Sequence, residues 1–240
     1  MKYKYLIFDA DHTLLNYIKD ELTAFTSLYQ EIGLPITENV LKKSRRYSEE
    51  EWTNAGLYKV NDENTQKNYH LLYRTHVTGV FERIFKEEKF EGNPNIAGER
   101  FLKLLEREST LVHGAEETLK ALQDKAEIYI ATNGLKDIQT GRLQAIKGLY
   151  KKAFISEEIG FIKPLPLFFE KILEELNASA SECLMIGDSL SSDIAGAKNV
   201  GMDACWFSAG LQENMAGVQP DYQISSLQEL LNIIDRIKFQ

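Results

Sequence analysis

YLIFDADHT, residues 5–13, joins four apolar residues to two carboxylates and a hydroxyl. The apolar run is typical of a buried strand, so Asp9, Asp11 and Thr13 are expected at its C-terminal end. Paired carboxylates near a core are costly unless a cation, a proton or hydrogen bonds offset their charge. The stretch is therefore either a turn with solvated acids or the edge of an active site.

Further apolar runs of strand length follow residue 112 and alternate with amphipathic helical patterns. The runs span residues 126–131, 153–156, 183–186, 204–207 and 222–224, and helical patterns span residues 165–176 and 227–237. This alternation is typical of βαβ units around a parallel sheet. We expect an α/β protein with a doubly wound, Rossmann-like parallel sheet.

The segment between the first strand and these units has helical spacing throughout. Its apolar stripes are Leu22, Phe25, Tyr29 and Ile32, closed by Gly33, and Val77, Phe81, Ile84 and Phe85. Such spacing predicts an all-helical cap domain inserted into the core. We place the core at residues 1–18 and 110–240 and the cap at residues 19–109.

Composition limits the partners and the compartment. The 240 residues carry 28 Lys and Arg against 36 Asp and Glu, a net charge of −8, which disfavours nucleic-acid and anionic-membrane partners. Cys183 and Cys205 lie among apolar residues, as reduced thiols of a cytoplasmic protein do. Asp9 interrupts the apolar run after Lys2 and Lys4, so neither a signal peptide nor a membrane span is expected. The composition is compatible with both a monomer and a homodimer.

Polar residues follow three later strands as well as the first. Thr132 and Asn133 follow the second strand, Lys163 lies in GFIKP after the third, and Asp188 ends the fourth, with Asp193 close behind. Each has an ordinary structural reading, as a turn residue, a helix cap or a loop lysine. However, open α/β sheets bind ligands at the carboxyl ends of their strands, where all these residues would meet.

The chemistry of these residues is complementary. Carboxylates bind a hard cation such as Mg²⁺, and Thr132, Asn133 and Lys163 can hold phosphoryl oxygens. One carboxylate remains as a nucleophile and another as an acid and base. The combination indicates phosphoryl transfer.

Four motifs carry a resemblance to a known family. The order D-x-D-x-T-L, T-N-G, K-P and G-D-S-x-x-x-D resembles the haloacid dehalogenase-like (HAD) phosphohydrolases whose helical cap follows the first motif. Within that family, DADHTL, ATNG, ISEEIGFIKP, LMIGDSLSSDIAGAKNVGM and a cap segment containing Trp52 are similar to the bacterial pyrimidine 5′-nucleotidases of the YjjG type.

The resemblance implies a role for each motif residue in catalysis. Asp9 would attack phosphorus and form an aspartyl-phosphate. Asp11 would protonate the leaving alkoxide and then deprotonate the hydrolytic water. Thr132 and Lys163 would bind phosphoryl oxygens with help from Asn133.

The resemblance also implies a metal site and a specificity site. Mg²⁺ would lie between Asp9, the main-chain oxygen of Asp11 and Asp188, with Thr13 and Asp193 in support. Specificity would come from the cap, where aromatic residues are either cap core or base contacts. Trp52 is our candidate for a substrate contact.

His12 departs from the commonest family sequence, which has glycine at this position. Its side chain either faces solvent or the cap without a role, or meets the leaving group and affects closure.

We expect a Mg²⁺-dependent phosphomonoester hydrolase that acts on pyrimidine nucleoside 5′-monophosphates. The alternatives are a phosphatase for sugars or other small metabolites, a phosphomutase, and, from another class, a phospho-aspartate switch or binding protein. The dehalogenase branch of the family lacks the second acid of the first motif, which is present here as Asp11.

Overall fold

The computed structural model describes residues 2–209 and 217–237. The chain divides into two compact units. The core unit comprises Met1–Asn16, Thr110–Lys136 and Leu143–Gln240, and the cap unit comprises Tyr17–Ser109 and Asp137–Arg142.

The core unit contains a six-stranded parallel sheet with the strand order β3-β2-β1-β4-β5-β6. The strands are β1 (Tyr5–Phe8), β2 (Glu127–Thr132), β3 (Lys152–Ile155), β4 (Cys183–Gly187), β5 (Asp203–Phe207) and β6 (Tyr222–Ile224). The predicted strands agree with these bounds to within one residue at each end. The doubly wound parallel sheet is thus confirmed.

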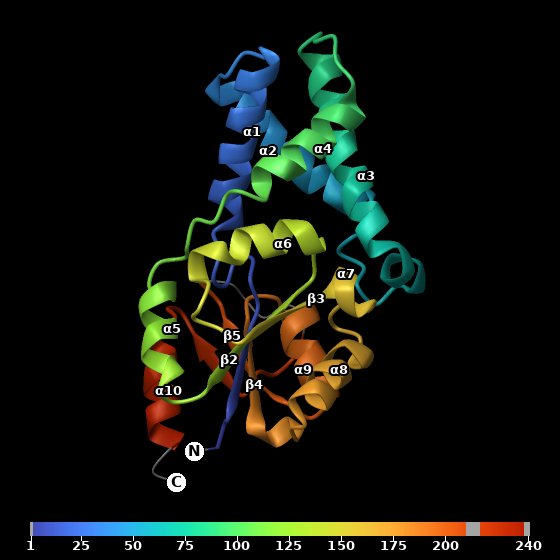
Figure 1. Cartoon of the computed structure of the whole chain (residues 1–240). Coiled ribbons are helices and arrows are strands. Elements are labelled where there is room, and N and C mark those ends of the chain that lie inside the picture. Colours follow the sequence, from blue (N-terminus) through green and yellow to red (C-terminus); the bar gives the residue numbers. More distant parts are fainter. Residues whose placement is uncertain (1, 210–216, 238–240) are drawn as a thin grey trace. The chain divides into compact units, whose positions relative to one another are not determined.

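Helices cover both faces of the sheet (Figure 1). Leu6 and Phe8 of β1 pack with α5 and α10, whereas Tyr5 and Ile7 pack with α8 and α9. Both faces of the strand are therefore buried, which explains its continuous apolar sequence. The helices of the core unit are α5 (Ala115–Gln123), α7 (Ser156–Ile159), α8 (Pro166–Leu176), α9 (Ala195–Asn199) and α10 (Glu229–Ile237), and its short helical turns are η1 (Leu143–Ile146), η2 (Ala180–Glu182) and η3 (Leu190–Ile194). Helix α6 (Lys136–Arg142) belongs, apart from Lys136, to the cap unit.

The strand register brings the motifs together. Phe8 is paired with Ile130 of β2 and with Ile186 of β4. The residues that follow these three positions therefore leave the sheet at the same edge, which brings Asp9 close to the T-N-G and G-D-S motifs.

The cap unit is helical and has an aromatic core. Its helices are α1 (Tyr17–Ile32), α2 (Glu38–Asn54), α3 (Glu63–Glu87) and α4 (Pro94–Leu105). Phe25 lies in ring contact with Tyr29, Phe81 and Phe101. Both predicted apolar stripes contribute to this core.

Residues 137–142 cluster with the cap unit although we expected them within the core. Arg142 links this segment to the cap unit, because its guanidinium binds the Asp20 carboxylate at 2.9 Å and the Glu108 carbonyl at 3.3 Å. Arg142 and Asp20 are both fully buried.

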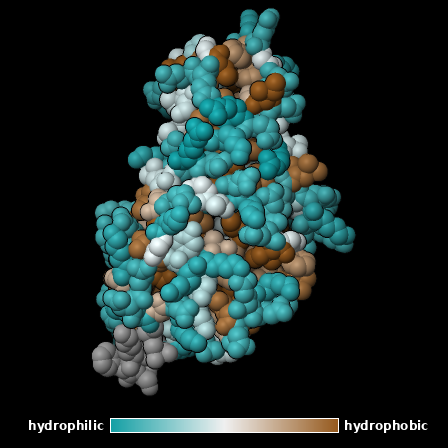
Figure 2. Space-filling model, viewed as in Figure 1, coloured by the Kyte–Doolittle hydropathy of each residue, from teal (hydrophilic) through white to brown (hydrophobic). Residues whose placement is uncertain are grey.

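The face shown in Figure 2 is mainly hydrophilic, with small scattered hydrophobic areas. Over the described part of the chain, no helix has both the length and the apolar character that a membrane span requires. Cys183 and Cys205 are buried free thiols, and they pack on opposite faces of the sheet.

Candidate active site

Asp9 lies directly after β1, where the register predicts. Its backbone N–H donates to the Ile186 carbonyl at 2.8 Å, which extends the pairing with β4 by one step. Only 7% of the residue is exposed. The first carboxylate of the motif is thus a buried group at the edge of the sheet.

A tight turn after Asp9 brings Thr13 back to the same edge. His12 has a left-handed backbone, with φ of 64°, and its N–H donates to the Leu15 carbonyl. The Thr13 hydroxyl consequently lies 3.5 Å from Asp9 Oδ2 and 3.4 Å from Asp188 Oδ1. Thr13 therefore links the first and fourth motifs, while the Asp11 side chain is half-buried in the turn.

Lys163 supplies a buried positive charge. Its Nζ donates to Asp9 Oδ1 at 2.5 Å, to Asp193 Oδ1 at 2.7 Å and to the Ala131 carbonyl at 2.7 Å. Burial by itself would lower the pKa of Lys163, but the charges of Asp193 and Asp9 outweigh burial and raise it. The ammonium group is therefore held in its charged form against Asp9.

The T-N-G loop positions Lys163 in turn. Asn133 accepts a hydrogen bond from the Lys163 N–H at 2.8 Å and donates one to the Lys163 carbonyl at 2.9 Å. The Gly134 N–H donates to Ser156 Oγ at 3.0 Å, a support that the sequence reading missed because serine has no distinctive spacing there. Thr132 is buried at the end of β2. Phosphoryl binding by Thr132 and Asn133 stays a prediction.

Asp193 organises the loop after β4. Its Oδ2 accepts the Ser189 N–H at 3.0 Å while its Oδ1 accepts Lys163. A Cβ at Gly187 would lie 2.2 Å from Asp193 Oδ2, so only glycine fits before Asp188. Both Asp193 oxygens are thus used by protein donors.

The cluster contains three carboxylates and one lysine, and therefore more negative than positive charge. Asp9, Asp188 and Asp193 each offer an oxygen, and these oxygens lie within 4.8 Å of one another. Burial, together with Asp193, raises the pKa of Asp188 to about 7. Burial also raises the pKa of Asp9; Lys163 opposes this shift, and Asp193 and Asp188 add to it.

A divalent cation would offset this excess of negative charge. Because Asp193 already binds Lys163 and Ser189, Asp9 and Asp188 are the carboxylates best placed to hold it. The oxygen donors fit Mg²⁺, which prefers such ligands.

Trp206 of β5 contacts the same loop. Its indole Nε1–H donates to the Asp188 carbonyl at 2.9 Å, and the residue is 2% exposed. The sequence reading missed this contact because an aromatic residue in an apolar strand indicates only core packing.

Trp52 lies in the cap unit, on α2. Its ring packs edge-on against Tyr69, Tyr73 and His76 of α3, with centroid distances of 6.2, 5.9 and 5.4 Å. Burial lowers the pKa of His76 to about 4, so the imidazole is neutral at pH 7. No motif in the sequence marks His76.

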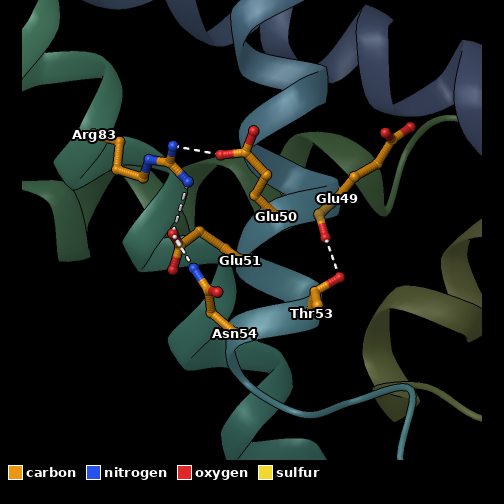
Figure 3. Close-up of a pocket in the computed structure, with 6 residues that line it drawn as sticks. All are labelled: Glu49, Glu50, Glu51, Thr53, Asn54 and Arg83. Atoms are coloured by element: carbon orange, nitrogen blue, oxygen red, sulfur yellow. Dashed lines mark hydrogen bonds and ion pairs between the residues drawn. The ribbon is translucent and has the colours of Figure 1, made fainter.

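A hollow lies between α2 and α3 of the cap unit (Figure 3). Glu50 and Glu51 both bind Arg83, at 2.5 and 3.0 Å, and Glu51 also accepts Asn54. Glu49 and Glu50 also bind Arg45 and Arg46, at 3.0 and 3.5 Å. Three arginines thus offset the three glutamates of the hollow, which lacks the excess negative charge of the cluster around Asp9.

The family whose model matches this chain is the one that the four motifs indicated. Residues 3–201 match the family described as haloacid dehalogenase-like hydrolase. The chain belongs to this family. It is therefore a HAD hydrolase, an enzyme whose four motifs meet at one edge of the sheet.

Similar proteins match along nearly the whole chain. The pyrimidine 5′-nucleotidase PynA of Streptococcus pneumoniae is 34% identical, over 98% of this chain and 97% of that protein. The pyrimidine 5′-nucleotidase YjjG of Escherichia coli is 29% identical, over 98% of this chain and 99% of that protein. The chain thus resembles named nucleotidases in both its core and its cap.

The solved structures show the same architecture. YfnB of Bacillus subtilis, a HAD hydrolase described as bound to magnesium, has a TM-score of 0.84 and 28% identity over 98% of this chain and all of that chain. A 2-haloacid dehalogenase from Pseudomonas syringae, with a TM-score of 0.68 and 22% identity over 98% of this chain and 99% of that chain, shares the fold.

Proposed function

We propose that the protein is a Mg²⁺-dependent phosphomonoester hydrolase that acts on nucleoside 5′-monophosphates, with pyrimidine nucleotides preferred. The observation that supports this most strongly is the buried contact of Lys163 with Asp9, within a cluster of three carboxylates at the sheet edge. This arrangement supplies a nucleophile, a fixed positive charge and ligands for a cation.

The first step would form an aspartyl-phosphate. Lys163 holds Asp9 Oδ1 and the Thr13 hydroxyl lies 3.5 Å from Oδ2, so the carboxylate is held in place for one of its oxygens to attack phosphorus. As the new O–P bond forms, the P–O bond of the ester breaks, and Asp11 gives its proton to the departing alkoxide.

The second step would return the enzyme to its starting state. Asp11, now ionised, takes a proton from a water molecule, whose oxygen attacks phosphorus. The bond between phosphorus and Asp9 breaks, and inorganic phosphate leaves.

Lys163 and Thr132 would stabilise the phosphoryl oxygens during both steps. The Asn133 contacts hold the Lys163 backbone in place for this role. Bound Mg²⁺, held by Asp9 and Asp188 with the Asp11 main-chain oxygen, would neutralise charge on the phosphoryl group.

The substrate class rests on the similar proteins and on the cap. PynA and YjjG are named as pyrimidine 5′-nucleotidases and match along the whole chain. The aromatic cluster around Trp52 offers ring faces and edges that could contact a base. The buried free thiols fit a reducing compartment, so we place the enzyme in the cytoplasm.

A panel of phosphate esters tests the proposal. Phosphate release would be measured from dUMP, dTMP, UMP, dAMP, sugar phosphates and phosphoserine, with Mg²⁺ and with EDTA. We expect metal-dependent turnover that is greatest on pyrimidine monophosphates.

Other outcomes would contradict parts of the proposal. Turnover that is greatest on sugar phosphates would overturn the nucleotide preference and leave the mechanism standing. A requirement for a bisphosphate would favour a phosphomutase. A stable phosphoprotein without turnover would favour a phospho-aspartate switch.

A further inference from the structure

One peptide group next to Asp188 is held from both sides. It joins Asp188 to Ser189, so it carries the Asp188 carbonyl and the Ser189 N–H. The carbonyl accepts the Trp206 indole N–H at 2.9 Å, and the N–H donates to Asp193 Oδ2 at 3.0 Å. Both polar groups of this peptide are thus bound to fixed side chains.

Each of the two side chains is rigidly placed. Asp193 is fully buried and is also bound by Lys163. Trp206 is 2% exposed, lies in β5 and is paired in register with Gly187 of β4. Neither can move without disturbing the sheet or the core cluster under α8 and α9.

This peptide fixes the backbone immediately after Asp188. If its hydrogen bonds were lost, the Asp188 Cα could shift at the end of β4, and the carboxylate that it carries would move relative to Asp9 and Thr13. Groups that hydrogen-bond to a metal ligand commonly tune the affinity of the site for the metal. The indole N–H that donates to the Asp188 carbonyl should therefore affect the affinity for Mg²⁺. The bulk of Trp206 serves core packing, but packing alone does not require an N–H aimed at Asp188.

We propose that Trp206 is a positioning residue for the cation site, and that its indole N–H orients Asp188 for Mg²⁺. This inference rests on the proposed metal site at Asp9 and Asp188. It predicts that loss of the N–H weakens the binding of Mg²⁺ even in the absence of substrate.

Two variants separate the N–H from the ring. Trp206→Phe removes the donor together with part of the ring. The chain contains only two tryptophans, Trp52 and Trp206. In a Trp52→Phe background, biosynthetic replacement of tryptophan by β-(3-benzothienyl)alanine therefore changes position 206 alone. This residue has sulfur in place of the N–H and keeps the bicyclic shape. Phe154→Leu is the control, because it trims another buried aromatic of the same core cluster.

Mg²⁺ affinity would be measured by calorimetric titration of the full chain without substrate. We expect affinity about tenfold weaker in Trp206→Phe and in the benzothienyl protein, each relative to its parent, and unchanged affinity in Phe154→Leu. Unchanged affinity in the benzothienyl protein would overturn the inference. If the wild-type protein does not bind Mg²⁺, the proposed metal site fails, and the inference fails with it.

Discussion

His12 has a conformation that favours glycine. Its φ of 64° is left-handed, and a β-carbon there costs about 1 kcal/mol. We therefore expect His12→Gly to be more stable to urea than His12→Ala by about 1 kcal/mol. Equal stability of the two variants would show that the turn is not strained.

The same variants address the role of the His12 side chain. An unchanged kcat/KM and an unchanged pH profile in His12→Ala would indicate that the His12 side chain has no role in catalysis. A change in either would favour contact with the leaving group or an effect on closure.

Glu21 makes the stability of the protein depend on pH. The residue is 4% exposed, and burial raises its pKa to about 7, although Ser48 and Arg45 oppose this shift. The folded state thus keeps a proton that the unfolded state releases, and stability falls as pH rises from about 4.5 to about 7.

Glu21→Gln should remove this loss. We expect the variant to match the wild type near pH 4.5 and to exceed it at pH 8 by about 3 kcal/mol, measured by chemical denaturation. Glu38→Gln, at a residue whose side chain is 82% exposed, is the control. A constant difference between Glu21→Gln and wild type across this pH range would contradict the assignment.

The site residues that could be predicted from the sequence are those that lie in the four motifs. Asp9, Lys163 and Asp188 follow strands at recognisable spacing, so their meeting at one edge was predictable. The Trp206 contact with Asp188 depends on the pairing of β4 with β5. Nothing in a local pattern distinguishes that tryptophan from ordinary core.

At the scale of elements, helices α1 and α6 are joined by a buried ion pair. Asp20 and Arg142 bind at 2.9 Å with side chains 0% and 1% exposed. Asp20→Asn removes the carboxylate charge that the buried guanidinium binds. We expect Asp20→Asn to lower the free energy of unfolding by about 3–5 kcal/mol.

Glu31→Gln provides the matched control for this prediction. Glu31 binds Arg100 at 2.6 Å, but both side chains are more than a third exposed. Its loss should cost less than about 1 kcal/mol in the same denaturation experiment. Similar losses in the two variants would show that the buried pair has no special weight.

The strands were largely predictable, because each is a short apolar run. The helical character of the cap was predictable from the two apolar stripes that lie in α1 and α3. The grouping of residues 137–142 with the cap unit was not predictable. It depends on a contact between Arg142 and Asp20, which are far apart in the sequence.

At the scale of the whole molecule, Mg²⁺ should stabilise the fold. A ligand at about 100 times its dissociation constant stabilises the native state by about 2.7 kcal/mol. We expect thermal denaturation to shift upward with Mg²⁺ and to return with EDTA. Asp188→Asn should lose most of this shift, and an equal shift in that variant would contradict the proposed ligand.

The fold class follows from the alternation of strands and helices, which is a property of the whole sequence. The substrate does not follow in the same way. Under the proposed function, base preference would depend on how cap side chains such as Trp52 meet a ligand. Aromatic residues at helical spacing are compatible with both core and contact roles.

The central claim, that Asp9 is the nucleophile of a phosphatase, is tested most directly by the turnover of Asp9→Asn. The variant would be assayed on the best ester of the panel, beside Asp203→Asn, an acid at the start of β5 that binds Lys2. We predict that Asp9→Asn loses at least about a thousandfold in kcat/KM, about 4 kcal/mol, whereas Asp203→Asn stays close to wild type. Turnover of a folded Asp9→Asn enzyme within about tenfold of wild type would contradict the claim.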